Sequence, residues 1–457
     1  MTHAVFEHTL TPAASLVAPA FRKYPSKLFL EPTTRCNLAC PMCVKQTTAS
    51  AIDDGDFAVA LLPALEPAFP HLEALIISGV GEPLLAGDLA GLLRRARALM
   101  PTTARIGLQT NGSLLTEATA VDLITAGLNQ VCLSLDAVTP DKFRELRVGE
   151  EIDTIDRAFS ALRRAKDRCC RPEVRIGVEF VVRQSNITEL PGVVRWAAQR
   201  GASFVMVSHL LPYDERHASE VAFGDCTDKA IEQFRKWQER GEQQGLDIRS
   251  YYDDRLFLKY VRLPEVIFFR DPVEKPIFSL VEGLKADAEH NGITFDIRKL
   301  FRLDFVRHKM ISGIFAEARV VAGETGIELH LPELTLKEQR KCPFIEDGSA
   351  FVSWRGDVSP CHFLWHQYHC HASGWDQSVQ QKIFGSLTER NIVEIWNDQV
   401  FREFRREALA YDYSSCISCS LEPCNYVQTD EFEHDCHIRS VPCGSCLWSR
   451  GVFQCLR

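Results

Sequence analysis

The sequence predicts an α/β fold in which a partial barrel of six strands and their connecting helices is followed by a small cysteine-rich domain. Between residues 27 and 212, short apolar runs alternate with amphipathic stretches, a pattern typical of parallel βαβ units. Ten of the 17 cysteines fall between Cys342 and Cys455. In a reducing compartment such spaced cysteines indicate metal ligation more often than disulfides.

The six strands of the barrel are predicted from apolar, β-branched runs, and they occupy residues 27–33, 72–79, 105–110, 130–136, 174–182 and 203–211. The run at 130–136 places Val131 and Leu133 on one face and Ser134 and Asp136 on the other. A parallel sheet covered only by helices is apolar on both faces. Polar residues on one face therefore favour a hollow interior that holds a ligand, with a few hydrogen-bonded polar core residues as the alternative.

Four regions follow from these patterns. We expect an N-terminal extension at 1–26, the barrel at 27–212, a helical bridge or insertion at 213–340, and the cysteine-rich domain at 341–457. The formal net charge of -9 argues against nucleic acid or an anionic membrane as a partner. No apolar run approaches the length of a membrane span and the N-terminus lacks the pattern of a signal peptide, so we expect a cytoplasmic protein.

Three cysteines, Cys36, Cys40 and Cys43, follow the first predicted strand on one short loop. Thiolates at this spacing suit zinc or an iron–sulfur cluster. A structural zinc site closes with four protein ligands, whereas three ligands on a four-iron cluster leave one iron open for a small molecule. The CxxxCxxC loop resembles the signature of the radical S-adenosylmethionine (SAM) superfamily. The resemblance implies a [4Fe-4S] cluster on these cysteines that binds SAM and cleaves it to a 5′-deoxyadenosyl radical.

Further motifs of that superfamily have counterparts along the predicted barrel. The run Ser78-Gly79-Val80-Gly81-Glu82-Pro83 resembles its GGEP element, although Val80 replaces one glycine. Glycines there let the backbone approach a ligand. The resemblance implies that SAM is bound by a set of residues on the second, third and fourth strands: Gly79, Gly81, Glu82, Pro83, Asn111, Ser134 and Asp136. His209, Tyr213 and Glu179 are expected to be structural, and we assign no acid–base residue.

The C-terminal cysteines resemble the SPASM domain, the auxiliary-cluster module of peptide- and protein-modifying radical SAM enzymes. A cysteine, then a glycine separated by four residues from a second cysteine, match its opening half, but the delayed Cys436 and the extra CxxC pair depart from its closing half. The resemblance implies two auxiliary [4Fe-4S] clusters on nine cysteines: Cys342, Cys361, Cys416, Cys419, Cys424, Cys436, Cys443, Cys446 and Cys455. Cys370 is left out, and a pair of zinc ribbons is the alternative.

The segments at 356–368 and 443–455 resemble a SPASM subgroup of metalloenzyme maturases, some of them associated with tungsten-containing aldehyde oxidoreductases. This resemblance implies an enzyme that modifies a protein or its pterin–metal cofactor, fed with electrons by a flavodoxin or ferredoxin. Modification of a ribosomally made peptide, by thioether formation, epimerisation or crosslinking, is the alternative reaction. A non-catalytic iron–sulfur electron carrier is the alternative of another class, and it would not require Glu82, Ser134 and Asp136 around an open iron.

Overall fold

The computed structural model describes residues 17–47, 52–252, 274–372, 374–413 and 443–456. Four of the predicted auxiliary ligands, Cys416, Cys419, Cys424 and Cys436, lie outside these ranges. Among the described residues, no helix is both long enough and apolar enough to cross a membrane.

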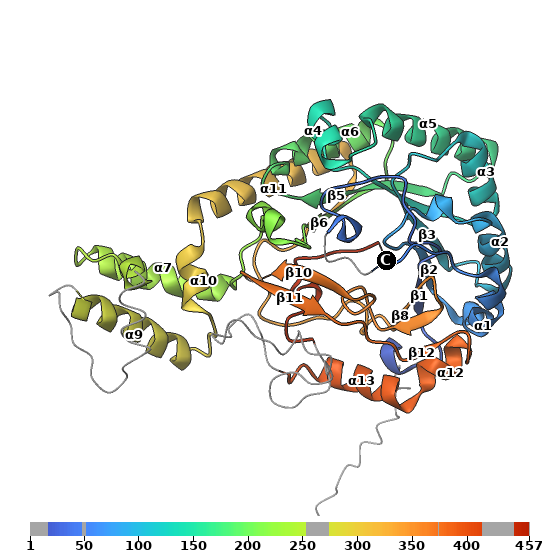
Figure 1. Cartoon of the computed structure of the whole chain (residues 1–457). Helices are drawn as coiled ribbons and strands as arrows, with labels where there is room; N and C mark the ends of the chain where they lie inside the picture. The colour runs from blue at the N-terminus through green and yellow to red at the C-terminus, as the bar shows by residue number, and fades with distance from the viewer. Residues whose placement is uncertain (1–16, 48–51, 253–273, 373, 414–442, 457) are drawn as a thin grey trace, which may run out of the picture.

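All six predicted barrel strands are present, and they lie side by side in chain order within one sheet (Figure 1). They are β1 (Lys27–Leu30), β2 (Ala74–Ile77), β3 (Arg105–Thr110), β4 (Gln130–Ser134), β5 (Arg175–Val182) and β6 (Phe204–His209). Each pairs in parallel with the next. The predicted α/β fold class is therefore confirmed.

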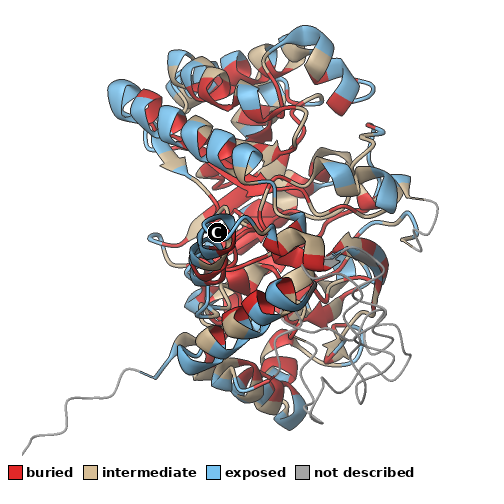
Figure 2. Cartoon of the chain, turned by 90° about the vertical axis from the view of Figure 1, so that its left-hand side faces the viewer, coloured by how far each residue is buried: buried red, intermediate tan, exposed pale blue. Residues whose placement is uncertain are grey.

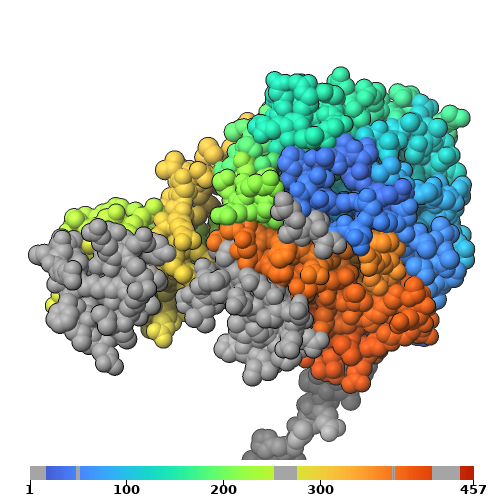
Figure 3. All heavy atoms as spheres, in the orientation of Figure 1, coloured from blue at the N-terminus to red at the C-terminus, as the bar shows by residue number. Residues whose placement is uncertain are grey.

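The sheet continues beyond these six strands on both sides. Within the described residues it has ten strands in the order β12-β9-β8-β1-β2-β3-β4-β5-β6-β7. The four additional strands are β7 (Glu328–His330), β8 (Ser349–Val352), β9 (Asp357–Ser359) and β12 (Gly385–Ser386). Strand β8 pairs in parallel with β1, with Leu28 opposite Ala350. The C-terminal region thus extends the barrel sheet, and Figure 3 shows its orange surface adjoining the blue N-terminal part.

Helices cover the outer face of the barrel, and the sheet between them is buried (Figure 2). They are α1 (Leu62–Leu65), α2 (Leu89–Leu99), α3 (Glu117–Thr125), α4 (Pro140–Leu146), α5 (Ile152–Arg168) and α6 (Leu190–Gln199). Helix α2 begins where Asp88 accepts a hydrogen bond from the Gly91 amide, and Thr116 caps α3 in the same way. Such caps satisfy amides that have no partner within the helix.

The region between the barrel and the cysteine-rich part is helical, as the sequence indicates. It contains α7 (Asp228–Glu242), α9 (Glu274–His290), α10 (Ile297–Arg302) and α11 (Phe305–Thr325). Residues of the first three helices form a small core of their own around Phe234 and Leu284. Helix α11 packs instead on α6 of the barrel.

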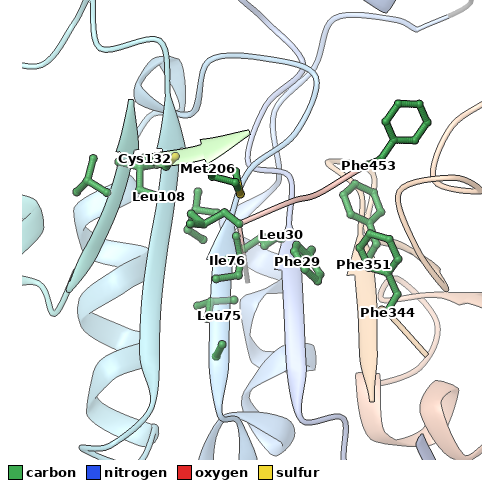
Figure 4. Packing of buried hydrophobic residues seen from close by; sticks show 14 of the residues in the cluster. Phe29, Leu30, Leu75, Ile76, Leu108, Cys132, Met206, Phe344, Phe351 and Phe453 are labelled. Atoms are coloured by element: carbon green, nitrogen blue, oxygen red, sulfur yellow. The ribbon is translucent and has the colours of Figure 1, made fainter. Parts of the chain in front are cut away.

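After β9 the chain forms the hairpin of β10 (Tyr368–Ala372) and β11 (Trp375–Val379), then α12 (Ile392–Asn397) and α13 (Gln399–Ala410). The C-terminal region, counted from residue 341, shares a core with the barrel. Figure 4 shows Phe29 of β1 beside Phe344 and Phe351 of that region. The last described residues return to the barrel, and Figure 4 shows the ribbon running from Phe453 towards the barrel strands.

Candidate active site

A cavity of about 340 Å³ opens at the carboxyl ends of the barrel strands, which is where α/β folds place their ligand sites. Nine of the residues singled out in the sequence line this cavity: Cys36, Cys40, Cys43, Gly79, Gly81, Glu82, Asn111, Ser134 and Cys455. Two others, Pro83 and Asp136, are not part of its lining. The sequence motifs that are far apart along the chain therefore meet at one place.

The loop that carries Cys36, Cys40 and Cys43 is held by backbone and side-chain hydrogen bonds. The Cys43 amide donates to the Cys40 carbonyl over 3.0 Å, and the hydroxyl of Thr34, two residues before the first cysteine, donates to the Asp53 carbonyl over 2.7 Å. Burial raises the pKa of the Cys40 thiol to about 11, while the Arg147 guanidinium lowers it and the two other thiols raise it. The thiols of Cys36 and Cys43 are thus close enough to Cys40 to raise its pKa.

These residues fit an iron–sulfur cluster better than a single metal ion. Among the described residues, no three His, Cys, Asp or Glu side chains converge on one ion-sized point. In a four-iron cluster each thiolate binds a different iron, so its ligands stand further apart than those of zinc. The Arg147 guanidinium supplies the positive charge that an anionic cluster requires, because it lines the same cavity as Cys40.

The two glycines of the turn after β2 make room for other parts of the protein. A Cβ atom on Gly79 would lie 2.5 Å from Cγ of Glu31, and one on Gly81 would lie 2.5 Å from the Thr33 and Arg35 carbonyl oxygens. The Glu82 amide donates to that Arg35 carbonyl over 2.8 Å. The structure gives a physical reason for glycine at 81 that the sequence does not show, which is that Gly81 lets the turn pack against the base of the cysteine loop.

Glu82 is nearly fully buried at the cavity wall and its carboxylate is fixed from three sides. It accepts hydrogen bonds from the Thr110 hydroxyl at 2.6 Å, the Asn111 amide at 2.7 Å and the Leu84 amide at 3.0 Å. Burial raises the pKa of Glu82, and these donors lower it. The Asn111 side chain donates to Asn37 of the cysteine loop over 2.9 Å. Glu82 and Asn111 are thus positioned together beside the three cysteines.

Asp136 has no exposed surface and does not reach the cavity. Its Oδ2 accepts from Nε and Nη2 of Arg147, both at 2.7 Å, and its Oδ1 accepts from the Val181 amide at 2.9 Å. Burial alone would lower the pKa of Arg147, but Asp136 and Cys40 raise it. Arg147 lines the cavity in place of Asp136. The sequence motifs gave no indication of Arg147, which lies in no recognised pattern.

Polar side chains of β3, β4 and β5 also line the cavity, as the alternation in the strands predicts. Ser134, Gln109 and Glu179 all line the cavity, and the Gln109 amide donates to the Glu179 carboxylate. Burial, and secondly the charge of Asp136, raises the pKa of Glu179 to about 7.

His209 is a packed histidine, in agreement with the structural role we expected for it. Its ring lies 5.3 Å from that of Phe223 and 6.2 Å from that of Phe315, and Nε2 is 3.0 Å from the Glu333 carbonyl oxygen. Burial lowers the pKa of His209 to about 4, so the ring is neutral.

A second cysteine group lies in the C-terminal region. Burial raises the pKa of Cys342 to about 12, and the neighbouring Cys446 raises it as well. Cys446 and Cys342 both raise the pKa of Cys361. Cys443 lies one turn before Cys446, whose amide donates to the Cys443 carbonyl over 3.2 Å. Cys455 lies in the lining of the main cavity.

A buried contact that the sequence did not reveal joins the barrel to the C-terminal region. Glu31, at the end of β1, has no exposed surface, and its two carboxylate oxygens lie 3.1 and 3.0 Å from Nε2 of His366. The Val80 amide donates to the same carboxylate over 3.0 Å. The segment 356–368 is identified in the sequence only by its resemblance to a SPASM subgroup, and that resemblance does not reveal the contact of His366 with Glu31.

Comparison with known proteins identifies two domains. Residues 30–178 match the model of the radical SAM superfamily, and residues 342–420 match the SPASM model, described as an iron–sulfur cluster-binding domain. The tungsten-containing aldehyde ferredoxin oxidoreductase cofactor-modifying protein of Pyrococcus furiosus is 25% identical over 432 residues, which cover 94% of this chain and 96% of that protein.

Other similarities are more local or weaker. The pre-heme d1 synthase of Dinoroseobacter shibae is 34% identical over 189 residues, covering 39% of this chain and 42% of that protein. Among solved structures, Streptococcus suis SuiB bound to the precursor peptide SuiA is 15% identical, with a TM-score of 0.46 and coverage of 89% of this chain and 73% of that one.

Proposed function

The chain is a radical SAM enzyme with a C-terminal SPASM domain, and we propose that it is a metalloenzyme maturase that modifies the protein or the pterin–metal cofactor of an oxidoreductase. The observation that carries this proposal is the similarity to the cofactor-modifying protein of Pyrococcus furiosus. That similarity extends over 94% of this chain, so it includes the helical region between the two domains. The radical SAM domain alone is shared with enzymes of several different chemistries, and therefore does not define a substrate.

In this proposal Cys36, Cys40 and Cys43 would hold a [4Fe-4S] cluster, and SAM would bind in the adjoining cavity. Bound there, the cluster and SAM would supply radical chemistry that removes a hydrogen atom from the substrate. The Glu82 carboxylate, fixed by Thr110 and the Asn111 amide, is proposed to accept hydrogen bonds from the ammonium group of SAM. No reorientation of Glu82 is needed on binding, because its hydrogen-bond donors already hold it.

Arg147 is the cation of the site. Its pair with Asp136 keeps the guanidinium charged and fixed, so it balances the negative charge of the cysteine thiolates and can bind a carboxylate of the ligand. Asp136 is then a positioning residue that acts through Arg147. Ser134, Gln109 and Glu179 provide hydroxyl, amide and carboxyl groups at the cavity, which suit the hydroxyl groups of a ribose.

Cys342, Cys361 and Cys446 are proposed to bind an auxiliary cluster. Their mutual proximity supports one such cluster within the described residues. A second auxiliary cluster would use the cysteines between 416 and 436, which lie outside those residues. A flavodoxin- or ferredoxin-type protein is the proposed electron donor, and the cysteine content is that of a cytoplasmic protein.

An anaerobic comparison of two proteins tests the cofactor assignment. The wild-type chain and a variant with Cys36, Cys40 and Cys43 all changed to Ala are reconstituted with iron and sulfide, reduced with dithionite and given SAM. The wild type is expected to form 5′-deoxyadenosine, and the variant is expected to form none and to lose about four irons. Formation of 5′-deoxyadenosine by the variant, or zinc in place of iron in the wild type, would refute the assignment.

The substrate is tested by asking what stimulates 5′-deoxyadenosine formation. Three additions are compared, namely a tungsten-containing aldehyde oxidoreductase isolated without its cofactor, the same protein with its cofactor, and a set of short precursor peptides. Stimulation by the oxidoreductase or its cofactor, together with a mass change on either, is expected. Stimulation by a peptide alone would replace maturation with peptide modification.

A further inference from the structure

Residues of the turn at 78–83 line the cavity, and three backbone amides hold this turn in place. The Ser78 and Glu82 amides donate to backbone carbonyl oxygens over 3.1 and 2.8 Å. The Val80 amide, between them, donates to Oε1 of the Glu31 carboxylate over 3.0 Å. Of these three hydrogen bonds only the central one ends on a side chain. It is therefore the one that depends on how a side chain is oriented.

The Glu31 side chain also accounts for the glycine at position 79. A Cβ atom on Gly79 would lie 2.5 Å from Cγ and 2.9 Å from Oε1 of Glu31. Both distances are too short for a side chain at 79 to coexist with Glu31 in its present orientation. The turn and the carboxylate are thus packed directly against each other.

The C-terminal region supplies the other hydrogen-bond donors to Glu31. Nε2 of His366 lies 3.1 Å from Oε1 and 3.0 Å from Oε2, and the Trp354 amide donates to Oε2 over 3.4 Å. Because a carboxylate accepts hydrogen bonds, the His366 ring carries its hydrogen on Nε2. Glu31 has no exposed surface, so its carboxylate depends on these protein donors.

The His366 ring is itself held by aromatic neighbours. It lies 5.0 Å from the ring of Trp365 and 6.1 Å from the ring of Phe351, measured between ring centroids. Trp365 lines the same cavity as Val80. The hydrogen-bonded path from His366 through Glu31 to Val80 therefore joins two parts of the cavity lining that come from different domains.

A second contact of the C-terminal region reaches the cysteine loop. The Trp354 ring occupies the space that a side chain at Gly55 would need, and the Gly55 amide donates to the Thr34 hydroxyl over 2.9 Å. Thr34 lies two residues before the first cysteine of the loop. The segment that carries Trp354 and His366 thus supports both the 78–83 turn and the base of the cysteine loop.

We propose that Glu31 is a positioning residue of the SAM site and that His366 acts through it, so that SAM binding by the barrel depends on this contact from the C-terminal region. Without the His366 donor the carboxylate can rotate away from Val80. The turn then has more conformations to lose when a ligand binds, and the affinity falls. The inference rests on the proposed binding of SAM in the cavity, and it concerns two residues outside the motifs that predict that site.

Amide hydrogen exchange tests the positioning of the turn and requires no SAM. Reconstituted wild type, His366→Ala and the control Lys27→Gln are compared by peptide mass spectrometry. Lys27 pairs with Asp347 over 2.7 Å, so the control removes a contact between the C-terminal region and the other end of β1. Peptides that contain Val80 are expected to exchange about 10-fold faster in His366→Ala, the effect of losing one ordinary hydrogen bond. Equal exchange in the two variants would overturn the proposal.

The affinity for SAM is measured by equilibrium dialysis of the same proteins under anaerobic conditions. His366→Ala is expected to raise the Kd for SAM by about 10-fold. His366→Gln, which keeps an N–H donor near the position of Nε2, is expected to stay within about 3-fold of the wild type. Both His366→Ala and Lys27→Gln should lower the urea midpoint of unfolding. If His366→Ala lowered that midpoint and left the Kd unchanged, the contact would be structural only and the proposal would be wrong.

A double-mutant cycle tests whether His366 acts through Glu31. Glu31→Ala is expected to weaken SAM binding, and the double variant Glu31→Ala/His366→Ala is expected to bind SAM no more weakly than Glu31→Ala alone. Additive losses would show a separate route and contradict the proposal. If Glu31→Ala did not fold, the comparison of His366→Gln with His366→Ala would still decide. A wild type that did not bind SAM would refute the proposed SAM site, whereas the exchange experiment would still show whether His366 positions the turn.

Discussion

Replacing Gly81 with Ala is expected to disturb the cysteine loop through a backbone clash. The new Cβ would lie 2.5 Å from two carbonyl oxygens, those of Thr33 and Arg35, and 2.6 Å from the carbonyl carbon of Thr34. Carbon and oxygen atoms normally stay at least about 3.3 Å apart, so the loop or the turn must move by roughly 0.8 Å. No side chain can rotate to relieve this, because all three atoms belong to the backbone.

The magnitude follows from that displacement. Backbone shifts forced by an added methyl group cost about 1–3 kcal/mol, and a misplacement of about 1 Å can cost roughly 100-fold in rate. We therefore expect Gly81→Ala to lower the urea midpoint of unfolding and to slow 5′-deoxyadenosine formation by one to two orders of magnitude, about 10- to 100-fold.

Gly87→Ala is the matched control, because it lies six residues further along the same segment and a Cβ there meets nothing within 4 Å. Both variants are reconstituted in parallel, and their iron content, rate of 5′-deoxyadenosine formation and urea midpoint are compared. If Gly81→Ala behaved like Gly87→Ala in all three measurements, the packing of the turn against the cysteine loop would not matter as we have argued.

Three further predictions, one of them with a control variant, are tested by urea unfolding. Asp136→Asn leaves the buried Arg147 charge without its partner, so the free energy of unfolding is expected to fall by about 3–5 kcal/mol. The control Glu117→Gln removes one member of a largely exposed ion pair and should cost at most about 1 kcal/mol. Equal losses in the two variants would contradict the prediction. Because the pKa of Glu179 is raised from 4.5 to about 7, its stabilising contribution is complete below pH 4.5 and is lost as the pH rises through 7. Glu179→Gln should reduce the change of the urea midpoint with pH between pH 4.5 and 7. An unchanged pH dependence in this variant would show that Glu179 does not cause it. Gly313→Ala lies in α11, where a Cβ meets nothing within 4 Å, so it should stabilise by about 0.5–1 kcal/mol; a lower midpoint would count against this.

The six barrel strands could be predicted from the sequence because their signal is local. Each is an apolar run bounded by turn residues, and the CxxxCxxC loop follows the first of them directly. Strands β8 and β9 could not be predicted in the same way. They are four and three residues long, and β8 belongs to the barrel sheet only through its pairing with β1. A contact between such distant segments leaves no pattern in either one.

In the candidate active site, too, the positions set by local sequence could be predicted and those set by distant contacts could not. Cys36, Glu82 and Asn111 lie at the cavity because each sits at the end of a strand, which is a position the sequence reveals. Asp136 was predicted to contact SAM, but the structure turns its carboxylate towards Arg147, and only the path of the chain after β4 determines that. The role of Asp136 towards SAM stays a prediction of the resemblance.

The C-terminal cysteines could be recognised as a group but not assigned one by one. Spacing alone placed Cys455 with Cys443 and Cys446. In the structure Cys455 lines the main cavity and follows a turn at Gly451 with φ of +84°, and its role as a cluster ligand stays a prediction. A single glycine in the left-handed region is too common a feature to reveal such a change of direction.

The pairing of β1 with β8 has a consequence for how the protein folds. Strand β1 is among the first segments to be synthesised, yet the partner of Lys27 on this side is Ser349. Until the ribosome has delivered that partner, one edge of β1 carries unpaired amides and carbonyls, which favour association with other chains. Contacts between such distant segments also slow folding. Chains released before residue 349 should therefore aggregate, and a chaperone that shields the nascent barrel should raise the yield of the intact protein.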